Sequence, residues 1–299
     1  MAVVGPTGSG KSAVAMAVAR AVSGIEIVAV DAFQVYRGMD IGTAKPTPAD
    51  RAEIAHHGLD LADPAEDVSV VRYREAYDDA VAGIAGRGGR ALLVGGTGLY
   101  VSAVIDRLEP PGEWPDVRAS LEAVADTRAL YERLRALDPA AAAKMEASNR
   151  RRVVRALEVC VGSGRPFSGF GPGIGAYPRT DVVQIGLRWT RDQLTRRIED
   201  RFARFLAAGF LDEARSLAAR PDGLSRTARQ AIGYAELFAV VEGRSSLEEA
   251  TERAVARTRR FAVRQERWFR RDPRVHWVDI DDDPLVAVPH VLGALTACV

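Results

Sequence analysis

Residues 2–21 read AVVGPTGSGKSAVAMAVARA. A short apolar run ends at Val4, a glycine-rich loop covers residues 5–12, and an alanine-rich stretch follows from Ala13 to Ala21. A strand, a G-x-x-x-x-G-K-S loop and a helix in this order are typical of a polyphosphate-binding loop, because the backbone N–H groups and the helix N-terminus attract an anion. We expect these residues to bind a diphosphate or a nucleotide: Gly5, Pro6, Thr7, Gly8, Ser9, Gly10, Lys11 and Ser12. The hydroxyl of Ser12 would bind Mg²⁺.

Lysine usage supports this interpretation. The 41 basic residues include three lysines, at Lys11, Lys45 and Lys144. A chain that otherwise uses arginine has kept lysine in its glycine-rich loop, where a compact ammonium fits better than a planar guanidinium.

The first hundred residues alternate apolar strands with helical patterns. The apolar runs at 2–4, 25–30 and 91–94 predict a βαβ rhythm, and further strands are expected at 182–187 and 275–280. We therefore predict an α/β fold with a P-loop NTPase-like parallel sheet core flanked by helices. Ligands of such sheets bind beyond the carboxyl ends of the strands, where the loop, Asp31 and Thr97 would meet.

The pattern between residues 113 and 145 is helical and polar, and residues 162–178 form a glycine- and proline-rich loop. We predict a mainly helical insertion at 113–179, within a core made of residues 1–112 and 180–299. The core's C-terminal part would carry helices at 191–219, 228–241 and 247–271.

Composition limits the possible functions. The formal net charge of the 299 residues is +1, so an anionic partner must be held by local patches. Two cysteines, Cys160 and Cys298, are too few for a disulfide framework and lack metal-ligand spacing. Adjacent His56 and His57 have no third ligand at a fixed spacing, so we expect structural roles for them. We expect a cytoplasmic protein that acts as a monomer, without a leader or a membrane span.

Asp31 and Thr97 each follow a predicted strand. A carboxylate at Asp31 could act as a general base or hold the water shell of Mg²⁺, or it could simply cap a turn. The Thr97 hydroxyl could donate to a phosphate oxygen or cap a helix. The strand before Thr97 ends in Gly-Gly-Thr and has no acidic residue, which argues against an ATP-hydrolysing motor.

Two arginine clusters could contact nucleic acid. Arg151, Arg152 and Arg155 share one side of a predicted helix. Six further arginines recur at steps of four and three along the helix near the C-terminus: Arg253, Arg257, Arg260, Arg264, Arg267 and Arg271. Such stripes suit a phosphate backbone, although a charged stripe can also be an ordinary solvated face.

Residues 31–46, DAFQVYRGMDIGTAKP, closely resemble the signature of the bacterial tRNA dimethylallyltransferases. Companion segments match that family in the same order: 5–12, 56–60, 95–100, 151–158, 230–236 and 264–270. The resemblance covers nearly the whole chain. Its most specific part is the 31–46 block.

The resemblance implies an activity. Members of the family transfer a dimethylallyl group from dimethylallyl diphosphate to N6 of adenosine 37, next to the anticodon, in tRNAs that read codons starting with U. The product is N6-dimethylallyladenosine, and Mg²⁺ is the cofactor. The loop would then bind diphosphate rather than ATP, Asp31 would take the proton from the adenine amine, and Thr97 would steady the leaving oxygen. The acceptor base would be everted from its stack.

The resemblance also implies contacts with the tRNA anticodon stem-loop. The residues implied are Asp31, Ala32, Phe33, Gln34, Thr97, Arg118, Arg151, Arg152, Val153, Val154 and Arg155. Two positions depart from the family pattern: Ala32 stands where many members have serine, and Ala235 where many have lysine.

Three other functions stay open on the sequence alone: a small-molecule kinase, a prenyltransferase of free AMP, and a nucleotide-gated RNA-binding module.

Overall fold

The computed structural model describes residues 1–108, 111–170 and 175–297. The chain divides into two compact units, which we treat separately. Unit 1 comprises Met1–Asp106 and Arg179–Val299, and unit 2 comprises Arg107–Pro178. Within the described ranges, no helix is both long and apolar enough to cross a membrane.

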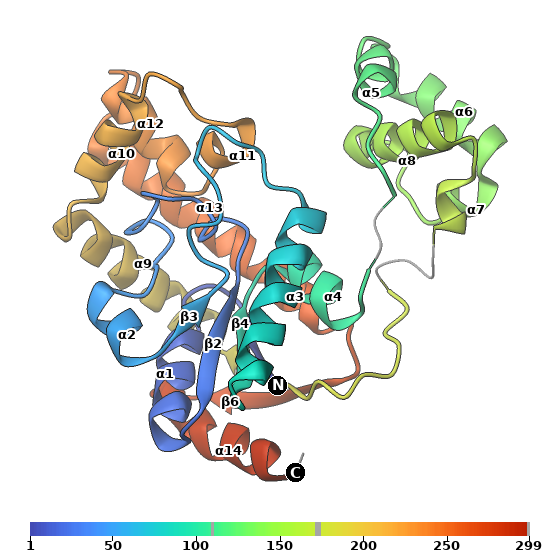
Figure 1. Ribbon diagram of the computed structural model, residues 1–299. Coiled ribbons are helices and arrows are strands. Elements are labelled where there is room, and N and C mark those ends of the chain that lie inside the picture. The colour runs from blue at the N-terminus through green and yellow to red at the C-terminus, as the bar shows by residue number, and fades with distance from the viewer. Residues whose placement is uncertain (109–110, 171–174, 298–299) are drawn as a thin grey trace. The chain divides into compact units, whose positions relative to one another are not determined.

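Unit 1 is built on a six-stranded, fully parallel sheet (Figure 1). The strands lie in the order β3-β2-β4-β1-β5-β6. Their bounds are β1 Ala2–Val4, β2 Ile25–Val30, β3 His56–His57, β4 Arg90–Gly95, β5 Gln184–Trp189 and β6 Val275–Ile280. The parallel α/β core is therefore confirmed. The two-residue strand β3 at the sheet edge was not expected from the sequence.

The strands β1, β2, β4 and β5 are largely buried, which explains why they are mostly apolar, whereas the edge strand β6 exposes His276 and Asp279. Neighbouring residues of β1 point in opposite directions: Val3 joins the core cluster with α1 and α14, whereas Ala2 and Val4 join the cluster with α3 and α4. The sheet is thus covered by helices on each side (Figure 1).

Ten α-helices belong to the described part of unit 1. They are α1 Lys11–Ala21, α2 Pro48–Glu53, α3 Val70–Gly86, α4 Gly98–Ile105, α9 Arg191–Ala207, α10 Phe210–Ala218, α11 Arg226–Arg229, α12 Tyr234–Val241, α13 Leu247–Phe269 and α14 Val288–Ala297. Two predicted helices were wrong in extent. The predicted helix 191–219 is broken where Gly209 adopts a φ of 96°, and the predicted helix 228–241 is broken at Gly233, with a φ of 91°. Positive φ ends a right-handed helix at little cost when the residue is glycine.

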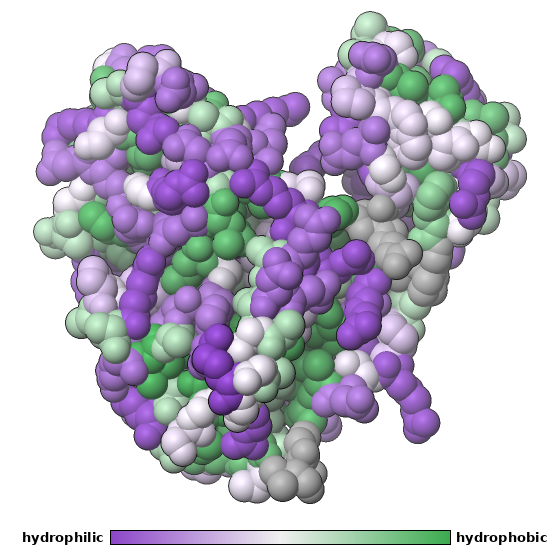
Figure 2. Space-filling model, in the orientation of Figure 1, coloured by the Kyte–Doolittle hydropathy of each residue, from purple (hydrophilic) through white to green (hydrophobic). Residues whose placement is uncertain are grey.

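The helices α10 and α12 contribute an aromatic layer to the core cluster that covers one face of the sheet in unit 1. Phe210 and Tyr234 are almost fully buried and pack edge to face, with ring centroids 4.8 Å apart. Hydrophilic side chains cover much of the visible surface over these helices (Figure 2). The layer therefore turns its aromatic residues inward.

Unit 2 is helical, with α5 Pro115–Glu122, α6 Thr127–Leu137, α7 Pro139–Ala142 and α8 Arg150–Ser163. Leucine and valine side chains of α5, α6 and α8 form its core. The Glu158 carboxylate is fully buried there and accepts the N–H of Trp114 at 2.8 Å. It also pairs with Arg118 at 2.7 Å and with Arg155 at 3.0 Å.

These contacts determine the ionisation of Glu158. Burial opposes the charged form, but the Trp114 N–H and the guanidinium groups of Arg118 and Arg155 outweigh it, so the pKa lies below the ordinary value of 4.5. The stabilisation is complete above pH 4.5, and it is lost as the pH falls through the lowered pKa of the folded protein.

We predict that Glu158→Ala destabilises unit 2 by about 3 kcal/mol, because two arginines lose their buried counter-ion. Hydrogen exchange of the α8 amides in the full-length chain measures this. The control is Glu132→Ala, which removes an exposed i,i+3 pair with Arg135 and should cost less than about 1 kcal/mol. Equal protection of α8 in the two variants would contradict the prediction.

Candidate active site

The glycine-rich loop lies between the end of β1 and the start of α1. Gly10 has a φ of 91° and precedes the helix directly, and a Cβ there would lie 2.5 Å from the Cβ of Pro284. Only glycine satisfies both the conformation and the close approach. Lys11 and Ser12 therefore begin α1, with the N–H groups of its first turn unpaired within the helix.

Residues distant in sequence hold this loop in shape. Gln265 on α13 accepts the N–H of Thr7 at 2.8 Å and donates to the carbonyl of Gly96 at 2.8 Å. The indole of Trp189 donates to the carbonyl of Ser9 at 3.0 Å. Gln265 thus ties the loop to the end of β4, a role that we did not predict from the sequence.

Two cations lie beside the loop. Lys11 Nζ donates to the carbonyl of Pro6 at 2.8 Å, and Arg201 of α9 donates to the Thr7 hydroxyl at 3.0 Å. Neither cation forms an ion pair within the described residues. Burial, followed by repulsion from Arg201, lowers the pKa of Lys11 to about 7, although Asp31 opposes this shift. Burial also lowers the pKa of Arg201 to about 10. A site that desolvates two cations in this way is suited to a polyanion.

Asp31 follows β2 directly. Its Oδ1 accepts the N–H of Phe33 at 2.8 Å and of Gln34 at 3.3 Å, so the carboxylate does cap the turn. Its Oδ2 has no hydrogen-bond partner within the described part of the chain, and Asp31 lines the same cavity as Lys11. One carboxylate oxygen is therefore used by the turn, while the other makes no hydrogen bond with the described residues.

Thr97 stands at the N-cap position of α4, but its side chain does not cap that helix. Instead, its Oγ1 accepts the N–H of Ala32 at 3.2 Å. This bond joins the end of β4 to the residue after Asp31. The hydroxyl hydrogen of Thr97 is left to be donated elsewhere.

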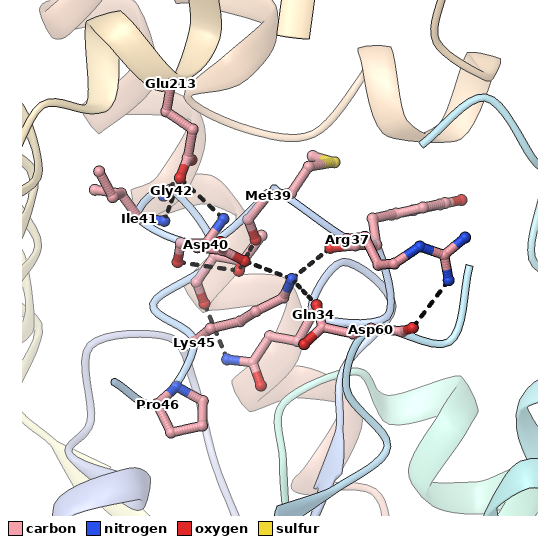
Figure 3. Close-up of polar contacts among 12 residues, drawn as sticks. Gln34, Arg37, Met39, Asp40, Ile41, Gly42, Lys45, Pro46, Asp60 and Glu213 are labelled. Atoms are coloured by element: carbon pink, nitrogen blue, oxygen red, sulfur yellow. Dashed lines mark hydrogen bonds and ion pairs between the residues drawn. The ribbon is translucent and has the colours of Figure 1, made fainter. Parts of the chain in front are cut away.

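Residues 40–46 form a tight turn around Gln34 (Figure 3). The Gln34 amide donates to the carbonyls of Thr43 at 3.0 Å and Ala44 at 3.1 Å. The side chain of Lys45, only 1% exposed, pairs with Asp40 at 2.7 Å and with Asp60 at 2.6 Å. Lys45 is therefore a structural element of the turn, unlike Lys11 in the loop.

One cavity of about 540 Å³ in unit 1 is lined by Lys11, Asp31 and Arg201, whereas Thr97 is not among its lining residues. Its polar lining includes Thr7, Lys11, Ser12, Asp31, Gln34 and Arg201. Its apolar lining includes Ile198, Phe202, Phe205, Phe210, Ile232 and Phe261. A cavity of this size, lined by charged and polar groups together with several aromatic side chains, suits a small ligand with a charged head and an apolar part.

The six residues implied as tRNA contacts in unit 2 fall into three groups. Arg151 and Arg152 are exposed on α8. Arg118 and Arg155 are engaged by Glu158, and Arg155 also donates to the carbonyl of Pro111 at 2.7 Å. The side chains of Val153 and Val154 are buried in the core of unit 2, so they have no access to RNA in this structure.

The arginine stripe on α13 is largely solvent-exposed. Arg257 is the exception, because it pairs with Glu236 and donates to the carbonyl of Gln230 at 3.2 Å. The other five have no ion pair within the described residues: Arg253, Arg260, Arg264, Arg267 and Arg271. They form a cationic face along α13 that the paired Arg257 interrupts, and Arg271 lies two residues beyond the end of the helix at Phe269.

The fold and the loop define a protein with a P-loop-related α/β core and a cavity for an anionic ligand. Residues 34–272 match the family described as "IPP transferase", and residues 1–59 match "Isopentenyl transferase". The chain therefore belongs to the IPP transferase family.

Named relatives agree with this assignment. The chain is 48% identical to the tRNA dimethylallyltransferase of Kineococcus radiotolerans, covering 99% of this chain and 96% of the relative. It is 46% identical to that of Kocuria rhizophila, covering 99% and 92%. The crystal structure of the tRNA isopentenylpyrophosphate transferase of Bacillus halodurans is similar, with 36% identity, a TM-score of 0.71, and coverage of 99% and 96%.

We predict that pyrophosphate binding at about pH 7.5 is accompanied by proton uptake, because a bound anion raises the lowered pKa of Lys11. Affinity should fall as the pH rises above about 7. Calorimetry in buffers of different ionisation enthalpy measures the protons taken up. Lys11→Met should abolish most of the uptake, whereas equal uptake by this variant would contradict the assignment to Lys11.

Proposed function

We propose that the chain transfers a dimethylallyl group from dimethylallyl diphosphate to N6 of adenosine 37 in tRNA. The observation that carries this proposal is the cavity in which two desolvated cations, Lys11 and Arg201, adjoin the carboxylate of Asp31. The N6–C1 bond forms, the C1–O bond to diphosphate breaks, and the proton of the amine passes to Asp31. These groups supply an anion site and a base within one cavity.

The cations act on the leaving group. Negative charge grows on the diphosphate as the C1–O bond breaks, and Lys11, Arg201 and the loop N–H groups stabilise it in a desolvated site. The Thr97 hydroxyl, whose oxygen is held by the N–H of Ala32, would donate to the departing oxygen. The apolar lining, including Phe205 and Phe261, would surround the dimethylallyl group and exclude water.

We also propose Mg²⁺ as the cofactor. Ser12 is exposed in the first turn of α1, and the described residues contain no cluster of three acidic, histidine or cysteine ligands. A serine hydroxyl after the lysine of such a loop is a typical Mg²⁺ ligand, and the ion completes its shell with phosphate oxygens and water. When bound, the ion would neutralise charge on the diphosphate.

For the acceptor, we propose the anticodon stem-loop of tRNAs that read codons starting with U. The exposed Arg151 and Arg152 and the cationic face of α13 would bind its phosphates. Phe33 and Gln34, which both line the cavity, would contact the everted adenine. We propose action as a monomer in the cytoplasm, where the tRNA substrate resides.

The direct test incubates the purified full-length chain with Mg²⁺, dimethylallyl diphosphate and unmodified tRNA, followed by digestion and mass analysis. We expect N6-dimethylallyladenosine at the position after the anticodon. ATP consumption without prenylation would favour a kinase, and modified AMP without modified tRNA would favour the free-nucleotide reaction. Nucleotide-dependent RNA affinity without any product would favour a binding module.

We predict that Asp31→Asn lowers the single-turnover rate by about 10²-fold or more. Asparagine can still accept the N–H groups of Phe33 and Gln34, so the turn is kept while the base is removed. The affinity for tRNA, measured by filter binding, should be nearly unchanged. Equal losses in rate and affinity would instead mark Asp31 as a structural residue.

We predict that Arg151→Ala and Arg152→Ala each weaken tRNA binding and reduce its log–log salt dependence by about 0.7 to 0.9 for each phosphate that the variant no longer neutralises. Titrations at several salt concentrations measure the slope. The control is Arg135→Ala in the same unit, because Arg135 is already paired with Glu132. An unchanged slope in both α8 variants would remove these residues from the RNA-binding surface.

A further inference from the structure

Glu213 of α10 binds residues 40–42 of the turn that follows Phe33 and Gln34, the two residues proposed to contact the adenine (Figure 3). Its Oε2 accepts the N–H of Asp40 at 3.0 Å and of Ile41 at 2.8 Å. Its Oε1 accepts the N–H of Gly42 at 3.3 Å and the phenol of Tyr234 at 2.6 Å. Four donors thus converge on one carboxylate, and hydrogen bonds to a charged acceptor are stronger than neutral ones.

The turn is also pressed against the aromatic layer. A Cβ on Gly42 would lie 2.3 Å from the ring of Phe210 and 2.5 Å from that of Tyr234. Burial, followed by the charge of Glu213, raises the pKa of Tyr234, which keeps the phenol protonated as a donor. The position of residues 40–42 is therefore fixed from two sides.

Residues 43 and 44 of this turn fix the side chain of Gln34. Both amide hydrogen bonds of Gln34 go to the carbonyls of Thr43 and Ala44, the residues immediately after the three N–H groups that Glu213 holds. Because its NH₂ group is committed, Gln34 presents its carbonyl oxygen as an acceptor. Gln34, Gly42 and Tyr234 all line the cavity.

We propose that Glu213 is a positioning residue that acts through the turn 40–44 to orient Gln34 toward the amine of the acceptor adenine. The role rests on the proposed function. An adenine amine has two hydrogens, so one can be held by Gln34 while Asp31 removes the other. A guanine would present its O6 to the same acceptor oxygen, and two acceptors repel.

The sequence alone could not reveal this role, since Glu213 lies 171 to 173 residues from the N–H groups that it accepts. The neighbouring acid, Asp212, provides a matched control. Its side chain is 77% exposed, and its ion pair among the described residues is with Arg215 of the same helix.

The experiment is a double-mutant cycle of Glu213→Gln and Gln34→Ala, measured by kcat and KM for tRNA prenylation. In Glu213→Gln the neutral amide has one acceptor oxygen, and its NH₂ group faces some of the donors that the carboxylate had accepted. The turn 40–44 is therefore held less tightly. We expect Glu213→Gln to lower kcat/KM for tRNA about tenfold, with the KM for dimethylallyl diphosphate unchanged. In the Gln34→Ala background the same change should have little further effect, and Asp212→Asn should have none.

Hydrogen exchange tests the structural premise without relying on turnover. The amides of residues 40–42 should exchange faster in Glu213→Gln than in the wild type or in Asp212→Asn, while the protection of β1 and β4 stays the same. Unchanged exchange at 40–42 would overturn the proposal.

The kinetic outcomes separate the two levels of inference. Two results would overturn the role of Glu213 while leaving the transferase activity in place. One is a loss of kcat/KM in the double variant equal to the product of the losses in the two single variants. The other is a KM for dimethylallyl diphosphate that rises in Glu213→Gln as much as the KM for tRNA. A wild-type protein that forms no prenylated RNA would overturn the proposed function and this role together.

Discussion

Parallel pairing of β1, β2 and β4 positions the glycine-rich loop, Asp31 and Thr97, and the rest of the site is built around them. Gly95 of β4 pairs in register with Val4 of β1 on one side and with Val30 of β2 on the other. The residues that follow these strands therefore leave the sheet at the same level. The glycine-rich loop, Asp31 and Gly96 meet at one edge because backbone hydrogen bonds align their strands, and Thr97 comes one residue later.

The electrostatics of the site follow from that arrangement. The loop brings Lys11 to the sheet edge, α9 adds Arg201, and Asp31 is the carboxylate that interacts with both. Two desolvated cations with one carboxylate leave the cavity short of negative charge, which a diphosphate would supply. The same desolvation explains why the pKa values of both cations are lowered.

Residues late in the chain, on α10, α13 and β5, then immobilise the edge. Gln265 joins the loop to β4, Trp189 binds the loop carbonyl of Ser9, and Glu213 holds the turn that orients Gln34. The C-terminal half of unit 1 therefore acts as a supporting layer for groups supplied by the N-terminal half. Preorganised donors and acceptors of this kind spare the reaction the cost of ordering them.

The parallel core, the loop and the place of Asp31 and Thr97 at strand ends could all be predicted from the order of residues, because they depend on local spacing and on the general geometry of βαβ units. The roles of Arg201, Gln265 and Glu213 arise only in the folded chain. Each lies on an amphipathic helix with many similar polar residues, and no local pattern marks which one turns toward a loop some 170 to 260 residues away. Folding likewise assigns Arg118 and Arg155 to a buried carboxylate, since the burial of Glu158 arises from packing between helices rather than from the order of residues along the chain.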